Sequence, residues 1–529
     1  MLLVSYEFLL FFAVLVILYY LVPRRFQWVL LLGASVLFYL SGGWKTIVFI
    51  LITIFTTWFF GLRLGKLGQE TKAYIKEHGL NREEKKAYRA ERKKISWRVL
   101  LLGLFVNVGI LAVLKYTNFA IGNLNSFLHI IGNDTGISPV DWMLPLGISY
   151  YTFQSVGYLI DVYRAKYEPE RHLGRFALFV SFFPQLVQGP ISRFDEMREQ
   201  FGRAHDFDWQ QITLGLERML WGYFKKLIVA DRLVHVVVTV SQDTDTYRGI
   251  YVLAGMLCYT VQIYADFSGG MDIVIGMAQV LGIRLPENFH RPYFSKTVGE
   301  YWRRWHMSLM TWLREYIFYP LSVCGPVTRL TRWCKTHFGD GVGRRVPVYG
   351  ASLIVWLVTG IWHGATWGFV IWGLMNCFVI LAASELVPWQ RKFHEKHSGL
   401  RERTWFKAVQ ICRTLLLLSV IQTLEYYKTV PRMGEMLGSI LMEWSAEPLF
   451  RGGFLTLGLD RWDWLAAGLG TVLMLLVSMA QRKGSVREQI RAFPWLLRFL
   501  IWFCLFLMVL IFGAYGHGFD ASQFIYNQF

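Results

Sequence analysis

The stretch Val99-Leu-Leu-Leu-Gly-Leu-Phe-Val-Asn-Val-Gly-Ile-Leu-Ala-Val-Leu114 decides the fold class, because an uncharged apolar run of this kind predicts a membrane-spanning helix. It directly follows the polar segment 63–98, which holds twelve Lys or Arg and five Glu. Basic segments between spans stay in the cytoplasm. Segment 63–98 is therefore predicted to be cytoplasmic, and the apolar run after it is predicted to return outward.

The composition of the whole chain is typical of a polytopic membrane protein. Of 529 residues, 54% are hydrophobic and only 17% are charged, and the mean hydropathy is +0.35. Average soluble chains carry about 25% charged residues. These figures exclude a disordered chain, a collagen-like fibre and a disulfide scaffold. We assign the net charge of +18 to cytoplasmic loops that touch anionic membrane lipids, and we predict no nucleic-acid partner.

Further apolar runs extend this pattern, and they cover Phe8–Val22, Trp28–Leu40, Ile47–Leu62, Leu144–Val162 and Trp495–Phe512. Counting spans back from segment 63–98 places the N-terminus outside. The basic segments 391–407 and 481–493 are predicted to lie inside, which places the C-terminus outside. We expect an all-α polytopic membrane protein with roughly 11–13 transmembrane or re-entrant helices.

The middle of the chain breaks this regular pattern. The run 176–189 is interrupted by Pro184 and Gly189-Pro190 and contains Gln185 and Gln188. Non-helical backbone survives at membrane depth only where protein or water satisfies it, so a re-entrant segment lining a cavity is predicted.

Two later segments of the middle are also irregular. Residues 301–321 mix Trp, Tyr and Arg as interfacial helices do, and residues 348–384 are interrupted at Trp362-His363-Gly364. We predict a single integral-membrane domain over 1–529. Its catalytic core, 142–384, is flanked by peripheral spans 1–115 and 385–529.

His363 is the foremost candidate for chemistry, because an ionisable residue inside an apolar span is costly and marks function. The flanking tryptophans, Trp362 and Trp367, would wall off bulk water. A neutral imidazole there accepts a proton from a hydroxyl near physiological pH. Backbone amides at the break Gly360–Gly364 are candidate donors to an oxyanion. The competing interpretation is a packing histidine bonded to a neighbouring helix.

His306 and Asp266 are further candidates. At helical spacing Trp302, Trp305 and Leu309 share one apolar face, and His306 would border it. There His306 would orient a substrate or pair with a carboxylate or, alternatively, reach lipid headgroups. Asp266 would fix a histidine tautomer or form a structural ion pair with an arginine such as Arg304.

The pair Lys225-Lys226 is interpreted as an inner-leaflet anchor in preference to an anion site. No GxSxG, HExxH or P-loop motif occurs, and the histidines lack the spacing of metal ligands, so no metal site is predicted.

Several stretches resemble the membrane-bound O-acyltransferase family, in its bacterial branch that O-acetylates alginate. They are Leu144–Phe153, Ile160–Arg164, Phe182–Pro190, Gly222–Lys226, Tyr264–Gly269, Glu287–Phe289, Tyr301–Leu309, Thr311–Tyr316, Trp362–Gly364 and Phe524–Phe529. After Tyr319-Pro-Leu321 the chain departs from that branch, because Ser322–Val327 replaces a turn rich in Gly, Asn and Arg.

The resemblance implies that His363 is the family's essential histidine and His306 its second characteristic one. It implies a bacterial cytoplasmic membrane, helices around a central funnel or tunnel, and no permanently bound cofactor. The acyl donor would be acetyl-CoA or an acyl-carrier thioester, and the acceptor would be a cell-surface polysaccharide. An extracytoplasmic esterase-fold partner and an acyl carrier protein are the partners implied.

The leading hypothesis is therefore an O-acyltransferase, with Trp362, Trp305, Gln185, Gln188 and Arg304 as supporting residues. D-alanyl transfer from a carrier protein to teichoic acid is an alternative within the same class. A proton-coupled transporter that uses His363 and Asp266 as a relay is an alternative from another class.

Overall fold

The computed structural model describes residues 1–133, 135–397 and 399–515, and this described part contains helices and no strands. The all-α prediction is confirmed. Eight of the described helices are long and apolar enough to cross a bilayer. They are α3 (Ile47–Glu77), α4 (Arg82–Ile130), α11 (Ile250–Val280), α15 (Gly325–His363), α16 (Trp367–Glu385), α18 (Thr404–Tyr427), α21 (Arg461–Ala480) and α23 (Trp495–Phe512).

The chain groups into two compact units. The first comprises Met1–Ile212 with Ala278–Leu285, and the second comprises Thr213–Met277 with the chain from Pro286 onward. Besides α3 and α4, the first unit holds α1 (Tyr6–Leu21), α2 (Gln27–Ser41), α5 (Ile148–Tyr163), α6 (Leu173–Ser181), α7 (Phe183–Gln188) and α8 (Phe194–Gly202).

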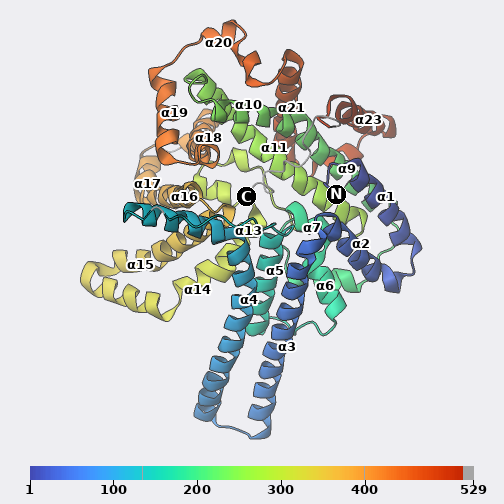
Figure 1. The fold of residues 1–529 in the computed structure, drawn as a ribbon, viewed down its shortest axis with the longest axis vertical. Coiled ribbons are helices and arrows are strands. Elements are labelled where there is room, and N and C mark those ends of the chain that lie inside the picture. Colours follow the sequence, from blue (N-terminus) through green and yellow to red (C-terminus); the bar gives the residue numbers. More distant parts are fainter. Residues whose placement is uncertain (134, 398, 516–529) are drawn as a thin grey trace. The chain divides into compact units, whose positions relative to one another are not determined.

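The polar segment 63–98 of the first unit is a helical hairpin. Helices α3 and α4 continue through it and lie side by side (Figure 1). Asn81 and Glu84 form a capping box that starts α4, which satisfies the free amides of its first turn. The rings of Tyr74 and Tyr88 stack across the hairpin at 4.4 Å. The cytoplasmic location of the segment stays a prediction.

In the second unit the shorter helices connect the spans. They are α9 (Trp209–Phe224), α10 (Asp231–Gln242), α12 (Val298–Trp302), α13 (Met307–Leu313), α14 (Tyr319–Ser322), α17 (Val387–Lys396), α19 (Val430–Met442), α20 (Glu447–Phe450) and α22 (Val486–Arg491). Two π-helical turns, η3 (Lys225–Ala230) and η5 (Arg314–Phe318), interrupt this series.

Helices α9 and α11 approach each other through glycines. A Cβ atom on Gly222 would lie 2.6 Å from the carbonyl oxygen of Gly269, and a Cβ atom on Gly276 would lie 2.6 Å from that of Gly215. Small residues let two membrane helices pack backbone to backbone. The contact brings the lysines of η3 against the carboxylates of α11.

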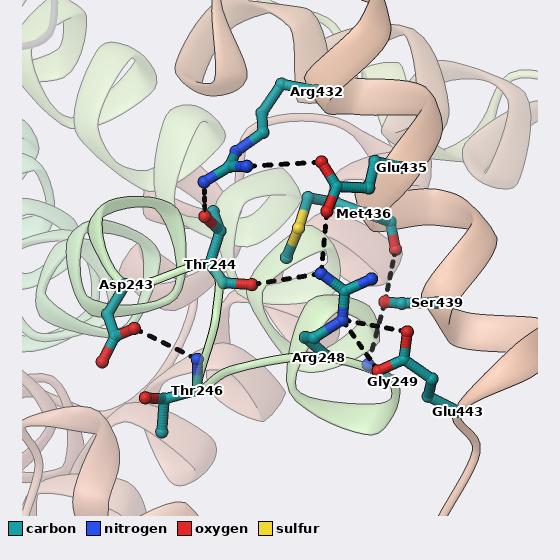
Figure 2. A network of polar contacts seen from close by, with 10 residues as sticks. All are labelled: Asp243, Thr244, Thr246, Arg248, Gly249, Arg432, Glu435, Met436, Ser439 and Glu443. Carbon is teal, nitrogen blue, oxygen red and sulfur yellow. Dashed lines mark hydrogen bonds and ion pairs between the residues drawn. The ribbon is translucent and has the colours of Figure 1, made fainter.

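The connection between α10 and α11 is fastened to α19 by a network of polar contacts (Figure 2). The Arg248 guanidinium pairs with Glu435 at 2.9 Å and with Glu443 at 2.7 Å. The amide of Gly249 donates to Ser439 Oγ at 3.0 Å. Gly249 has a φ of +58°, and a Cβ atom there would lie 2.4 Å from the Glu443 carbonyl oxygen, so the position requires glycine.

Residues 301–321 do not form the continuous interfacial helix that the sequence predicts. Helix α12 ends at Trp302, and His306 has left-handed backbone angles (φ 47°, ψ 51°) before α13 begins. Because of this turn, Trp302 and His306 do not lie on the same face of one helix. Its consequence is that His306 faces the interior and is 1% exposed.

Candidate active site

His363 lies at the break between α15 and α16. It is the last residue of α15 and is 8% exposed, and Gly364 continues in an extended conformation (φ −166°). A Cβ atom on Gly360 would lie 2.4 Å from the Phe369 carbonyl oxygen, so the glycine lets α16 approach closely. The predicted interruption at Trp362-His363-Gly364 is confirmed as a gap between two membrane helices.

The backbone of this break does not supply the predicted oxyanion donors. The amide of Gly364 donates to the carbonyl oxygen of Gly360 at 3.2 Å, which is the last turn of α15. The amides before it belong to the same helix. An oxyanion stabiliser would therefore have to be a group other than these amides.

Aromatic rings surround the His363 imidazole. The ring centroids of Trp372 and Trp362 lie 4.8 and 5.0 Å from it, and Phe369 stacks nearly parallel at 6.3 Å. Trp362 and Trp372 are 5% and 3% exposed. Trp372, which the sequence did not single out, is also a wall of the site, whereas the shielding role of Trp367, which is 60% exposed, stays a prediction.

His306 is held by Asn288. The amide oxygen Oδ1 of Asn288 accepts from both the N–H and the hydroxyl of Ser308 at 2.9 Å. The Asn288 amide nitrogen Nδ2 lies 3.1 Å from His306 Nδ1. Asn288 Oδ1 also lies 3.2 Å from His306 Nδ1, so the Asn288 side chain holds this ring nitrogen in place in either tautomer.

A single indole contacts both imidazoles. The Trp362 ring centroid lies 6.0 Å from that of His306 and 5.0 Å from that of His363. The edge of Phe267 meets the His306 ring at 4.8 Å. The structure thus brings His306, Trp362 and His363 together in one buried aromatic cluster of the second unit.

The supporting residues Trp305 and Arg304 have different surroundings. Trp305 is 3% exposed and packs on Phe289 at 4.9 Å. Arg304 pairs with Glu300 at 2.6 Å and is half-buried. Its predicted partnership with Asp266 is replaced by this pair within one helical turn.

Asp266 is fully buried and contacts a lysine instead of an arginine. Its carboxylate lies 2.6 Å from the ammonium of Lys226, which also contacts Asp231 at 2.7 Å. The neighbouring Lys225 contacts Asp272 at 2.6 Å and Ser268 at 2.8 Å. The interpretation of Lys225-Lys226 as a lipid anchor is wrong, because both side chains point into the protein.

Gln185 and Gln188 belong to the first unit, whereas the histidine cluster belongs to the second. Helix α6 ends at Ser181 and α7 runs from Phe183 to Gln188, so the run 176–189 is interrupted, at Phe182 and again after Gln188. That the segment is re-entrant and lines a cavity stays a prediction. Gln185 and Gln188 are 3% and 0% exposed, and Gln185 Nε2 donates to the Pro190 carbonyl oxygen at 3.0 Å. Their role toward a substrate stays a prediction.

A cavity of about 520 Å³ lies within the second unit, and Met307, which follows His306 in the chain, forms part of its wall. Its polar wall includes Arg218, Asp272 and Glu287, and its apolar wall comes from α21 and α23. A smaller adjoining cavity shares those three residues and reaches Asn288. The cavities therefore lead to the residue that holds His306.

Sequence reasoning missed Asn288, Trp372 and Arg218 as site residues. Asn288 stands in the motif Glu287-Asn-Phe289 and was quoted only for the resemblance. In the described part of the chain no three His, Cys, Asp or Glu side chains converge as metal ligands do, and the absence of a metal site stays a prediction.

Comparisons with known proteins give the same family as the motifs. The model of the MBOAT, membrane-bound O-acyltransferase family, matches residues 171–326 and 328–421. This chain belongs to the membrane-bound O-acyltransferase family. Both His306 and His363 lie inside the matched ranges. The terminal stretch Phe524–Phe529, also used for the resemblance, lies outside the described residues.

Three relatives illustrate the range of similarity. The "Probable alginate O-acetylase AlgI" of Azotobacter vinelandii is 36% identical over 67% of this chain and 63% of its own length. The "Peptidoglycan O-acetyltransferase" of Helicobacter pylori is 33% identical over 56% and 57%. The "Teichoic acid D-alanyltransferase" of Bacillus subtilis is 26% identical over 47% and 61%. The chain thus matches less than two thirds of the length of each.

Proposed function

We propose that this protein is a membrane O-acyltransferase that moves an acetyl group from a cytoplasmic thioester to a hydroxyl of a cell-surface polysaccharide. The observation that carries the proposal is His363, an imidazole buried among aromatic rings at the gap between two membrane helices. Relatives named for O-acetylation of alginate and peptidoglycan support the choice of reaction.

In the proposed reaction His363 is the general base. The acceptor hydroxyl gives its proton to the imidazole while its oxygen bonds to the thioester carbonyl carbon. Collapse of the tetrahedral intermediate breaks the carbon–sulfur bond, and the departing thiolate takes the proton back from the imidazolium. The surrounding indoles exclude water, which would otherwise hydrolyse the thioester. His306, oriented by Asn288, positions a reacting group from the other side of Trp362.

The cellular setting belongs to the same proposal. We place the protein in a bacterial cytoplasmic membrane with both termini outside, segment 63–98 inside and 142–384 as the catalytic core. Acetyl-CoA or an acyl-carrier thioester would be the donor. An extracytoplasmic esterase-fold protein would complete transfer to the polysaccharide.

Mass spectrometry of surface polymers tests this proposal in cells with the wild-type protein, with His363→Ala at equal abundance, and without the protein. We expect O-acetyl groups only with the wild type. D-alanyl esters in their place would favour the alternative suggested by the more distant teichoic-acid relative. Unchanged acylation with reduced proton or solute flux in His363→Ala would support a transporter and refute the enzyme.

A further inference from the structure

Glu425 is an acidic side chain in the last turn of the membrane-spanning helix α18. Its carboxylate accepts a hydrogen bond from the Tyr259 hydroxyl of α11 at 2.6 Å. The carboxylate of Asp266 pairs with Lys226, whereas Glu425 forms no ion pair within the described ranges. An ionisable group in a membrane helix is costly and marks function when no structural ion pair accounts for it. Glu425 therefore needs an explanation.

The packing of α16 against α18 brings Glu425 to the level of the candidate site. A Cβ atom on Gly368, at the start of α16, would lie 2.3 Å from the carbonyl oxygen of Lys428, which directly follows α18. The two helices thus touch backbone to backbone at this point. One helical turn away from it, Glu425 stands on α18 and Trp372 stands on α16. The two side chains therefore occupy matching levels of an antiparallel helix pair.

Trp372 connects this carboxylate to His363. The indole N–H is the only hydrogen-bond donor of a tryptophan side chain. In Trp372 it interacts with the Glu425 carboxylate, although outside the geometry of a regular hydrogen bond. The centroid of the same indole lies 4.8 Å from that of the His363 ring, at an interplanar angle of 62°. The contacts thus run in series from the carboxylate through the indole to the imidazole.

Aromatic packing alone does not fix the direction of the Trp372 N–H. The ring meets Trp302 at 5.6 Å and Trp356 at 6.3 Å between centroids, both edge to face. These neighbours hold the ring in place, but a buried indole N–H normally also has a polar partner. Glu425 supplies that partner and so favours one orientation of the indole. The orientation of the indole in turn limits the positions that the His363 ring can take.

We propose that Glu425 is a positioning residue, which orients the His363 imidazole by holding the Trp372 indole. This inference rests on the proposed function, since it concerns the base of that reaction. A general base must lie within hydrogen-bond distance of the hydroxyl, and a misplacement of about 1 Å can cost about 100-fold in rate. Loss of the Glu425 carboxylate should therefore slow the chemical step and leave binding of the acyl donor unchanged.

The test measures kcat and KM for thiol release from acetyl-CoA or an acetylated carrier protein by the full-length protein in lipid nanodiscs. Glu425→Leu removes the acceptor that faces the Trp372 N–H, and Glu425→Gln restores an oxygen that can accept from it. Ser419→Ala is the matched control, because Ser419 also joins α18 to α11, through a hydrogen bond with Thr260 Oγ1 at 2.7 Å. Thermal unfolding checks that each variant folds.

We expect Glu425→Leu to lower kcat at least about tenfold and to leave KM for the donor unchanged. Glu425→Gln should recover most of that loss, and Ser419→Ala should lower the melting temperature but not kcat. In a Trp372→Phe background, which lacks the N–H, Glu425→Leu should lower kcat no further. Additive losses in the double variant, no recovery in Glu425→Gln, or equal kcat in Glu425→Leu and Ser419→Ala would overturn the positioning role.

Nuclear magnetic resonance of the protein with isotope-labelled histidine gives a readout that does not need turnover. The His363 signal, identified by its loss in His363→Gln, should shift in Glu425→Leu and stay unchanged in Ser419→Ala. An unchanged signal in Glu425→Leu would overturn the inference even for an active acyltransferase. A shifted signal in a protein that transfers no acyl group would retain the link from Glu425 to His363 and refute the proposed function.

Discussion

Two networks of charged residues in the second unit have similar geometry and opposite surroundings. In the exposed network of Figure 2, Arg248 bridges Glu435 and Glu443 at the surface. In the buried network, Lys226 bridges Asp231 and Asp266 at 2.7 and 2.6 Å inside the helix packing. The Lys226 and Asp266 side chains are 2% and 0% exposed, against 25% for Arg248 and 44–45% for its partners.

The difference teaches which ion pairs the fold depends on. Water screens the exposed pairs, so each contributes little to stability. A buried charge that loses its partner has no water to replace it. The buried pairs therefore constrain the region beside the candidate site, whereas the exposed pairs fasten a connecting segment.

The largest effect is expected for Asp266→Asn, which leaves Lys226 with Asp231 alone. We expect a loss of about 3 kcal/mol in the free energy of unfolding, the lower end for breaking a buried pair. Asp231→Asn is the matched control on the same lysine, and because Asp231 is 21% exposed its loss should be smaller. Thermal unfolding in detergent measures both, and a larger loss for Asp231→Asn would contradict the ranking.

An intermediate loss in the free energy of unfolding is expected for Arg218→Gln. The guanidinium contacts Glu287 through two nitrogens at 2.6 Å and Asp272 at 2.8 Å. Asp272 retains Lys225 and Glu287 is largely exposed, so the expected loss is about 2 kcal/mol. Unfolding monitored by tryptophan fluorescence gives the value, and a loss above that of Asp266→Asn would show that Lys225 does not compensate.

A small effect is expected for Arg248→Gln. Removing the guanidinium leaves Glu435 and Glu443 in contact with solvent, so the melting temperature should fall less than for either buried variant. Proteolysis should detect loosening of the segment 243–249 before global unfolding does. A fall in melting temperature as large as that of Asp266→Asn would contradict the claim that the exposed network contributes less to stability than the buried one.

The smallest effect on stability is expected from lowering the pH. Hydrogen bonds from Arg248 hold the pKa of both Glu435 and Glu443 below the ordinary value of 4.5. Their contribution to stability is therefore present above pH 4.5 and is lost as the pH falls through the lowered pKa values. Melting curves between pH 3 and 6 should show this dependence in the wild type, and Arg248→Gln should flatten it.

The sequence predicted the long apolar helices that contain 47–62, 99–114 and 495–512, and the break at His363, because these features depend on local composition. The runs 8–22, 28–40 and 144–162 form helices of only 15 or 16 residues, and their crossing of the membrane stays a prediction. An apolar run such as 99–114 predicts a membrane-spanning helix, and glycines beside a histidine predict an interruption of the helix. The ion pairs of Lys225 and Lys226 were not predictable, since their partners lie on α11, far along the chain. Their inward direction depends on the π-helical turn η3, which leaves no clear sequence signal.

The turn before α13 was not predicted either, because it also depends on a contact with a residue far along the chain. The residues 301–309 have a helical pattern, but Asn288, from a separate loop, caps Ser308 and holds His306 in left-handed backbone angles. Tertiary contacts thus override local preference there. Trp372 was missed because only folding brings its ring to His363.

The most direct test of the central claim measures acyl transfer by the purified protein and its His363→Gln variant, with His397→Gln as an exposed control. The assay follows release of free thiol from acetyl-CoA or an acetylated carrier protein in the presence of a polysaccharide acceptor. We predict that His363→Gln lowers the rate at least about 100-fold while His397→Gln leaves it unchanged. A His363→Gln protein that folds and transfers acyl groups at the wild-type rate would contradict the account.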